Sequence, residues 1–172
     1  MGSRELEFFM WHLNYITDQI KMADNKMNFL LAIYLSLIGV VTVNIQKIFD
    51  ILGKISWRYK CFFFIDLLIL LGCVTGFIFL FINAVSPRID PRKILSDENY
   101  ISIIFWGDLS KVDMNEFKNI KMESFVEDLQ KQILINARIA ERKFNSVKNA
   151  YNVFLPTFIS FLIFVIFLIF GR

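Results

Sequence analysis

Three runs of apolar residues alternate with polar stretches along the chain, and each run is long enough to cross a lipid bilayer. They cover residues 27–46, 61–85 and 152–170. A helix of about 20 apolar residues crosses a hydrocarbon core about 30 Å thick. The pattern therefore predicts three transmembrane helices.

Helical periodicity extends from the first and third runs into the polar stretches before them. In residues 1–26 the apolar positions three or four residues apart are Phe9, Leu13, Ile16, Ile20 and Ala23. Before the third run the same spacing gives Val126, Leu129, Ile133, Ala137, Ala140, Phe144, Val147 and Tyr151. Ser124, with Glu127 three residues later, matches a capping box and is the predicted N-cap. No Pro or Gly separates either series from its run, so we predict helices that continue across the membrane surface.

The first and second runs are joined by residues 47–60, which we predict to be an external interfacial loop. Gly53 weakens a helix at this point. Trp57 and Tyr59 are side chains that favour the headgroup region of a bilayer.

Residues 86–151 are predicted to be a sensor segment outside the bilayer. Its apolar stretch Asn99–Trp106 favours a short strand or an apolar hook, closed by a turn at Gly107. Residues 113–121 favour a short helix with Asp113 as its N-cap.

Composition supports the same class of protein. The chain of 172 residues is 56% hydrophobic, has a mean hydropathy of +0.52 and contains 20 Phe, which is too apolar for a soluble domain of this size. We therefore predict an all-α integral membrane protein. It has three transmembrane helices, a small, mostly helical cytoplasmic region, and helices continuous across the membrane surface.

Basic residues are unevenly distributed around the ends of the three runs. One side carries Arg4, Lys21, Lys26, Arg88, Arg92, Lys93, Arg142, Lys143 and Lys148. The other side carries fewer, namely Lys47, Lys54, Arg58, Lys60 and Arg172. The positive-inside rule therefore predicts that the N-terminus and residues 86–151 lie in the cytoplasm. A net charge of +3 gives no indication of a nucleic-acid partner.

Several kinds of chemistry are not indicated. Cys61 and Cys73 lie about 18 Å apart along a helix and cannot form a disulfide with each other. One His and no Cys/His cluster argue against a metal site. Phosphate-binding glycine loops and catalytic serine or zinc motifs are not found in the sequence. We therefore predict neither an enzyme nor a bound cofactor.

A basic turn before the third run is the strongest candidate for binding a small anion. Arg138 and Arg142 lie four residues apart, so they share a helix face and offer planar donors to a phosphate, with Lys143 beside them. In the alternative interpretation, Glu141 pairs with Arg138 and the cluster only reaches lipid headgroups. Trp106 is a candidate for stacking on a base.

The second run contains an acidic residue, Asp66, and the Gly72/Gly76 pair. A carboxylate costs a few kcal/mol in hydrocarbon unless it is paired. Asp66 is therefore expected to be protonated, to face other helices, or to reach the headgroups or Lys60. The glycine spacing permits close helix contact, and Pro156 allows a kink near the entrance of the third run.

Several of these motifs resemble a known family in their order along the chain. They are Tyr15-Ile16, Ala23-Asp24-Asn25-Lys26 leading into the first run, Phe105-Trp106-Gly107, and residues 128–151 with Gln132, Asn136, Arg138-Ile139-Ala140 and Lys143-Phe144. This pattern is similar to the Pycsar effector transmembrane family of bacterial antiphage systems. Trp106, where the family pattern has Phe, and Met27, where a small residue is commoner, depart from it.

The resemblance implies a function for the whole chain. It implies that a partner nucleotide cyclase makes a cyclic pyrimidine mononucleotide (cCMP or cUMP) after phage infection. Binding of this ligand on the cytoplasmic side would impair the bacterial inner membrane and cause abortive infection. The partners expected are therefore the nucleotide, the cyclase, membrane lipid and further copies of the chain, without nucleic acid.

The candidate residues follow from the basic turn and the resemblance together. Those predicted to bind the ligand are Arg138, Arg142, Lys143, Asn136, Trp106, Asp24 and Lys26. Pro156 and Asp66 are predicted to couple binding to the membrane. Two other functions stay open, a membrane anchor that recruits a partner, and a small ligand-independent channel lined by Asp66.

Overall fold

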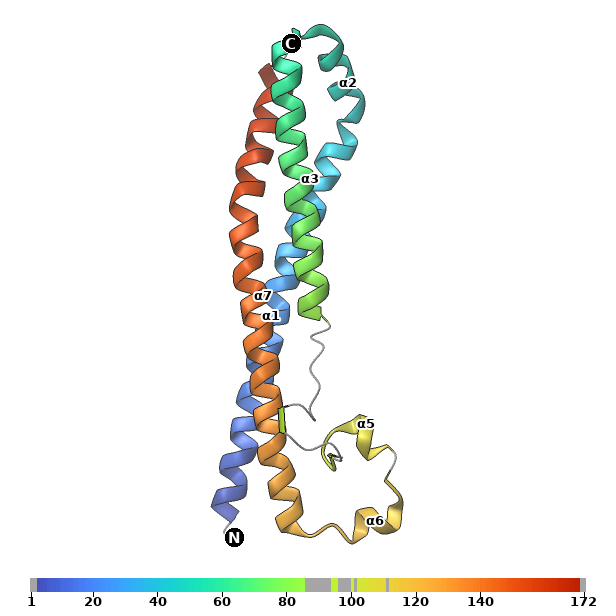
Figure 1. Ribbon diagram of the computed structural model, residues 1–172, viewed down its shortest axis with the longest axis vertical. Helices are drawn as coiled ribbons and strands as arrows, with labels where there is room; N and C mark the ends of the chain where they lie inside the picture. Colours follow the sequence, from blue (N-terminus) through green and yellow to red (C-terminus); the bar gives the residue numbers. More distant parts are fainter. Residues whose placement is uncertain (1–2, 86–93, 96–99, 101, 111, 171–172) are drawn as a thin grey trace. The chain divides into compact units, whose positions relative to one another are not determined.

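The computed structural model describes residues 3–85, 94–95, 100, 102–110 and 112–170. Its helices, in chain order, are α1 (Ser3–Val43), α2 (Ile45–Lys54), α3 (Trp57–Val85), α5 (Trp106–Leu109), α6 (Met114–Lys118) and α7 (Met122–Phe170) (Figure 1). None of the described residues lies in a strand. Helices α1, α3 and α7 are long and apolar enough to cross a membrane. The predicted all-α class and its three transmembrane helices are confirmed.

The helices are distributed over two compact units. The sensor unit comprises Met1–Ala23 and Pro87–Phe144, and the membrane unit comprises Asp24–Ser86 and Asn145–Arg172. Helices α1 and α7 each contribute to both units without a break, as the absence of Pro and Gly before each run predicts. The boundaries at residues 26, 86 and 151 stay predictions of where the membrane surface lies.

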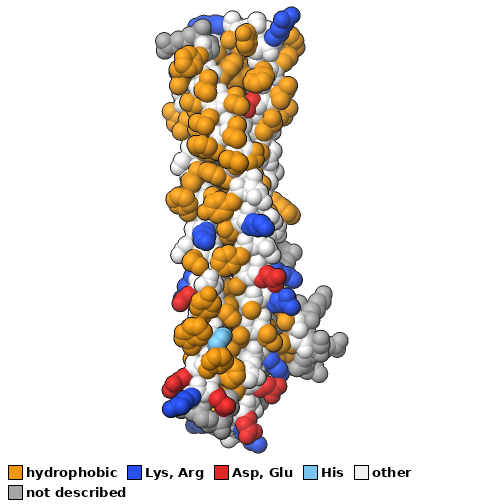
Figure 2. Space-filling model, turned by 90° about the vertical axis from the view of Figure 1, so that its left-hand side faces the viewer, with side chains coloured by type: hydrophobic (Ala, Val, Ile, Leu, Met, Phe, Trp, Pro, Cys, Tyr) orange, Lys and Arg blue, Asp and Glu red, His pale blue; other side chains and the backbone are white. Residues whose placement is uncertain are grey.

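The membrane unit exposes large apolar side chains. Leu68 is 69% exposed and Phe79 is 66% exposed on α3. On the face shown in Figure 2, hydrophobic side chains cover most of this unit, which is the upper part of the view. A hydrocarbon environment requires such an exterior, because lipid tails solvate apolar side chains and not polar ones.

An apolar cluster closes one end of the membrane unit. We call it the apolar plug, and its members are Ile48, Ile51, Phe63, Phe164 and Leu168. Helix α2 forms inside the predicted interfacial loop and includes Gly53. The weak helix propensity of this glycine is offset because Ile48 and Ile51, one turn apart, bury their side chains in the plug.

The long helix α7 begins earlier than the capping box predicts. It starts at Met122, and the Phe125 N–H donates to the Lys121 carbonyl over 3.1 Å. Ser124 therefore lies inside the first turn, and its prediction as the N-cap is wrong.

The packed face of α7 also differs from the predicted apolar series. Val126 and Leu129 are buried as predicted, but Ala137 is exposed. Asp128 and Gln132 are buried instead, at 6% and 7% exposure. Two buried polar side chains require hydrogen-bond partners, and these partners form the candidate functional site.

Candidate functional site

One carboxylate on α7 organises the sensor unit. Asp128 Oδ2 accepts hydrogen bonds from Ser102 Oγ at 2.9 Å, the Ile103 N–H at 2.9 Å and the Ile104 N–H at 3.0 Å. The Tyr100 hydroxyl donates to the other oxygen, Oδ1. Asp128 thus holds a segment more than twenty residues earlier in the chain against the first turns of α7.

Gln132, one turn further along α7, completes the cluster. Its Nε2 donates to the Tyr100 hydroxyl at 3.1 Å and to Ser102 Oγ at 2.9 Å. The Phe105 N–H also donates to Ser102 Oγ, at 2.9 Å, and the Ser102 N–H donates to Asp108 Oδ2 at 3.2 Å. We call this cluster the polar anchor and define it as Tyr100, Ser102, Asp108, Asp128 and Gln132.

The polar anchor explains the conformation of the segment that it holds. Residues 102–105 form bends and lead directly into α5. Their N–H groups bond to side chains, so the described part of the predicted strand is not a strand. Asn99 and Ile101 lie outside the described residues. The apolar hook is the better description of residues 102–105, whereas the predicted turn at Gly107 is wrong because Gly107 lies inside α5.

The Tyr100 hydroxyl is strongly perturbed by this environment. Burial, followed by the hydrogen bond to the Asp128 carboxylate, raises the pKa of Tyr100 to about 12. Lys131 Nζ lies 5.3 Å from the centre of the Tyr100 ring and 2.9 Å from Glu127 Oε1. Because its pKa is raised, Tyr100 is stabilised by the fold in its neutral form.

The predicted basic turn is divided between two faces of α7. Arg138 and Arg142 are exposed, and Arg138 Nη1 lies 3.2 Å from Glu141 Oε2. This is the ion pair of the alternative interpretation. Lys143 is buried at 8% exposure and Asn136 is half-buried, so these two lie toward the packed side.

The other predicted ligand residues lie elsewhere in the chain. Asp24 and Lys26 belong to the membrane unit, on α1. Trp106 begins α5, and its side chain lies outside what the structure describes.

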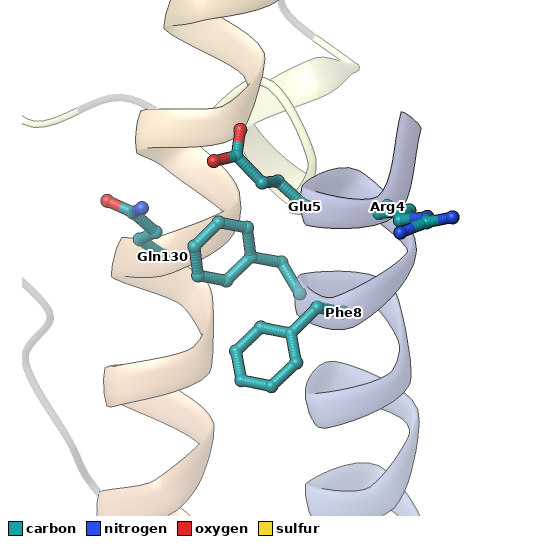
Figure 3. Close-up of a pocket in the computed structure, with 5 residues that line it drawn as sticks. Arg4, Glu5, Phe8 and Gln130 are labelled. Atoms are coloured by element: carbon teal, nitrogen blue, oxygen red, sulfur yellow. The ribbon is translucent and has the colours of Figure 1, made fainter. Parts of the chain in front are cut away.

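A groove in the sensor unit adds a surface that the sequence did not indicate. It has a volume of about 330 Å³ and is lined by Arg4, Glu5, Phe8, Phe9 and Gln130. Figure 3 shows Glu5 and Phe8 extending from α1 beside α7, from which Gln130 comes. Aromatic rings with a few polar groups are typical of a site for a small molecule, and the two charged residues of this groove, Arg4 and Glu5, have opposite signs.

The residues predicted to couple to the membrane lie in the membrane unit. Asp66 is 7% exposed and accepts a hydrogen bond from Ser160 Oγ of α7 over 2.7 Å. It therefore faces another helix, and the alternative in which it reaches headgroups or Lys60 is wrong. Pro156 lies inside α7, which continues past it to Phe170.

Metal chemistry finds no support in the part of the chain that the structure describes. No group of His, Cys, Asp and Glu there could hold a metal ion. Both cysteines, Cys61 and Cys73, are free, as their spacing predicts.

Three membrane-length helices and a small helical sensor unit held by buried hydrogen bonds define a small multi-pass membrane protein. A family model described as the Pycsar effector protein domain, PycTM, matches residues 8–171. Because the match covers nearly the whole chain, the protein belongs to this family, and the predicted resemblance is confirmed. No curated protein and no solved structure matches the chain.

Family membership gives the general function. It implies a membrane effector of antiphage defence that responds to a cyclic nucleotide signal from a cyclase. Effectors of this family disrupt membranes and are not catalytic.

Proposed function

We propose that this protein binds cCMP or cUMP on the cytoplasmic side and then impairs the inner membrane, which causes abortive infection. The observation that carries the proposal is a family match that includes all three membrane-length helices and the sensor unit. The excess of basic residues beside residues 1–26 and 86–151 supports a cytoplasmic N-terminus.

The phosphate of the ligand is proposed to bind at Arg138 and Arg142. Both side chains are exposed on one face of α7. The ion pair between Arg138 and Glu141 is exposed on both sides, at 65% and 60%, and such pairs contribute only about 0 to 1 kcal/mol. A phosphate can therefore replace Glu141 at low cost and form bidentate bonds.

The groove beside Phe8 is the competing location for the ligand. Phe8 is 56% exposed and presents a ring on which a pyrimidine can stack. In Figure 3 the charged end of Arg4 extends away from α7 and Glu5 extends toward it, so stacking on Phe8 is the contact that this location offers. Binding measurements on variants of Phe8 and of Arg138 and Arg142 distinguish the two locations.

A homo-oligomer is proposed because the sensor unit exposes aromatic rings. Trp11 and Tyr15 are 61% and 52% exposed, and their rings stack at 5.6 Å. Exposed aromatic residues mark interfaces more often than free surface. Light scattering in detergent should show a lower mass for Trp11→Ser than for the wild type, and an unchanged mass would contradict this interface.

Ligand binding is proposed to reach the bilayer through α7. This helix carries Arg138 and Arg142 and continues past Pro156 to Phe170. Binding shifts the membrane helices only as far as the ligand prefers one arrangement, and such coupling typically amounts to about 1 to 3 kcal/mol.

Calorimetric titration of purified protein with cCMP and with cUMP tests the ligand site. Combined Arg138→Ala and Arg142→Ala substitutions should weaken binding at least tenfold, because two charge-assisted contacts are lost. Lys21→Ala is the matched control, since Lys21 forms a similar exposed pair with Asp18 at 3.1 Å and should leave binding unchanged.

Other outcomes assign the function differently. Loss of binding only in Phe8→Ala would move the site to the groove. Absence of binding by the wild type would overturn the ligand proposal. Dye release from liposomes without nucleotide would favour the ligand-independent channel.

A further inference from the structure

Four polar side chains lie inside the membrane unit and join its three long helices. The Tyr34 hydroxyl of α1 lies 3.0 Å from Thr157 Oγ1 of α7. Ser160 Oγ, also on α7, donates to Asp66 Oδ1 of α3 over 2.7 Å. We call Tyr34, Asp66, Thr157 and Ser160 the polar file, and all four are buried, at 0% to 7% exposure.

The polar file lies deep in the membrane-length segments. Asp66 is about 14 Å along α3 from its first residue, Trp57, and Ser160 is about 15 Å from the last residue of α7, at about 1.5 Å per residue. Counted from Cys61, where the second run begins, Asp66 is about 7.5 Å inside the run, so both side chains lie within a hydrocarbon core about 30 Å thick. Acidic side chains inside this core are rare and are typical of functional sites such as ion pathways.

The two α7 hydroxyls that hold the file lie directly after a proline. Thr157 and Ser160 are three residues apart and therefore share one face of the helix. Pro156 has no N–H for the preceding turn, which lets α7 bend at this point. Because Thr157 and Ser160 both follow Pro156, a bend here would change the positions of both hydroxyls relative to Tyr34 and Asp66.

The apolar plug lies next to the file. Phe63 comes one turn before Asp66 on α3, and Phe164 comes one turn after Ser160 on α7. Their ring centres are 5.8 Å apart, and Phe63 also contacts Phe167 at 4.9 Å. Hydrophobic constrictions of this kind close channels by excluding water.

We propose that ions cross the activated protein along the polar file, which is closed in the structure described. Asp66 selects cations, and the Phe63/Phe164 contact is the gate. When α7 bends, water replaces the hydrogen bonds of the file, and the Asp66 carboxylate then faces the passing ions. This inference rests on the proposed function, in which ligand binding impairs the membrane.

Planar bilayer recordings under a KCl gradient, with and without cCMP and cUMP, test the inference. The wild type should show a nucleotide-dependent current whose reversal potential lies toward that of K⁺. Asp66→Asn should move the reversal potential toward zero, whereas Asp66→Glu should retain the selectivity. Asp50→Asn is the matched control, because Asp50 is an exposed acid on α2 outside the file, and it should behave as the wild type.

The gate has a separate readout. Phe164→Ala should produce current without nucleotide, at least tenfold above the wild type, because it removes a ring from the plug. Phe79→Ala removes an exposed ring of α3 and should produce none.

The two proposals fail in distinguishable ways. A wild type that shows no current with either nucleotide overturns the proposed function. A nucleotide-dependent current that is unselective, or that keeps its selectivity in Asp66→Asn, overturns the inference about Asp66 while the proposed function stands. Equal release of large cationic and anionic dyes would show lipid disruption and would also overturn the inference.

Discussion

The polar anchor of the sensor unit and the polar file of the membrane unit use the same chemical groups differently. Each contains a Tyr hydroxyl, a Ser hydroxyl and an Asp carboxylate. In the anchor, Asp128 accepts from two side chains and two main-chain N–H groups. In the file, Asp66 has one side-chain partner, Ser160. Because Asp128 accepts more hydrogen bonds than Asp66, we expect the polar anchor to stay intact and the polar file to open.

Separation of the file leaves few groups without partners. Thr157 Oγ1 also donates to the Val153 carbonyl over 2.7 Å, so it keeps a hydrogen bond when Tyr34 moves away. In the anchor, by contrast, the Ile103 N–H donates to Asp128, and the Ile104 N–H is shared between Asp128 Oδ2 at 3.0 Å and Ser102 Oγ at 3.2 Å. The anchor is therefore a fixed attachment, and the file is able to switch.

The largest expected effect is on the anchor, from Asp128→Ala. This substitution leaves the Ile103 N–H and the hydroxyls of Tyr100 and Ser102 without their acceptor, while the Ile104 N–H keeps Ser102 Oγ. Each unsatisfied buried group costs about 1 to 3 kcal/mol. We expect the free energy of unfolding to fall by about 3 kcal/mol or more, with faster proteolysis near residues 102–110. They are measured by urea titration and by limited chymotrypsin digestion in detergent, since this protease cleaves after Phe, Trp and Leu and residues 102–110 contain Phe105, Trp106 and Leu109.

Glu127→Ala is the control for that substitution. Glu127 is the preceding residue and pairs with Lys131 on the surface at 2.9 Å, so its loss should cost less than about 1 kcal/mol. Equal effects of the two substitutions would show that Asp128 does not hold the segment.

A smaller effect, confined to high pH, is expected from Tyr100. Its pKa is raised to about 12 from an ordinary value of about 10. The unfolded chain therefore loses this proton first, and stability that is complete below about pH 10 is lost as the pH rises through about 12. Thermal unfolding across this range should decline more steeply for the wild type than for Tyr100→Phe, and parallel profiles would contradict the assignment.

Ser160→Ala should have a modest effect on the membrane unit. Hydrogen bonds between membrane helices contribute about 0.6 kcal/mol on average and rarely more than about 1.7 kcal/mol. We expect a loss in this range in mixed-micelle unfolding. A loss as large as that of Asp128→Ala would mean that the file is as fixed as the anchor.

The smallest effect is expected from Gly72→Ala. No atom lies within 4 Å of a Cβ added at Gly72 or Gly76, so the glycine spacing does not serve close helix contact within the described chain. Stability of the single chain should change by less than about 1 kcal/mol, the ordinary helix-propensity difference. A fall in oligomer mass by light scattering would instead reveal a second copy packed on this face.

Features that depend on long local patterns could be predicted from the sequence alone. The apolar runs predicted α1, α3 and α7, because a membrane-length run needs no information from elsewhere in the chain. The anchor could not be predicted in this way, because the partners of Asp128 lie far away in sequence and two of them are main-chain N–H groups. Such groups have no sequence signature.

One signal for the anchor was nevertheless present. Gln132, Asn136 and Lys143 fall within about 40° of one another on a helix of 3.6 residues per turn, and Leu129 lies on the same side. Polar residues on an apolar face require polar partners. The packed face of α7 was predicted from its apolar residues alone, and this is why the prediction was wrong. The buried position of Lys143 was missed for the same reason.

The position of α7 after α1 and α3 in the sequence also affects the order in which the two clusters can form. The ribosome delivers Tyr34 and Asp66 to the membrane well before it synthesises Thr157 and Ser160, and Tyr100 likewise emerges before Asp128. Both clusters therefore wait for their α7 partners until that helix is synthesised. A nascent chain that stalls before Thr157 would leave Asp66 without Ser160 in the bilayer, so synthesis of α7 is the step that completes both clusters.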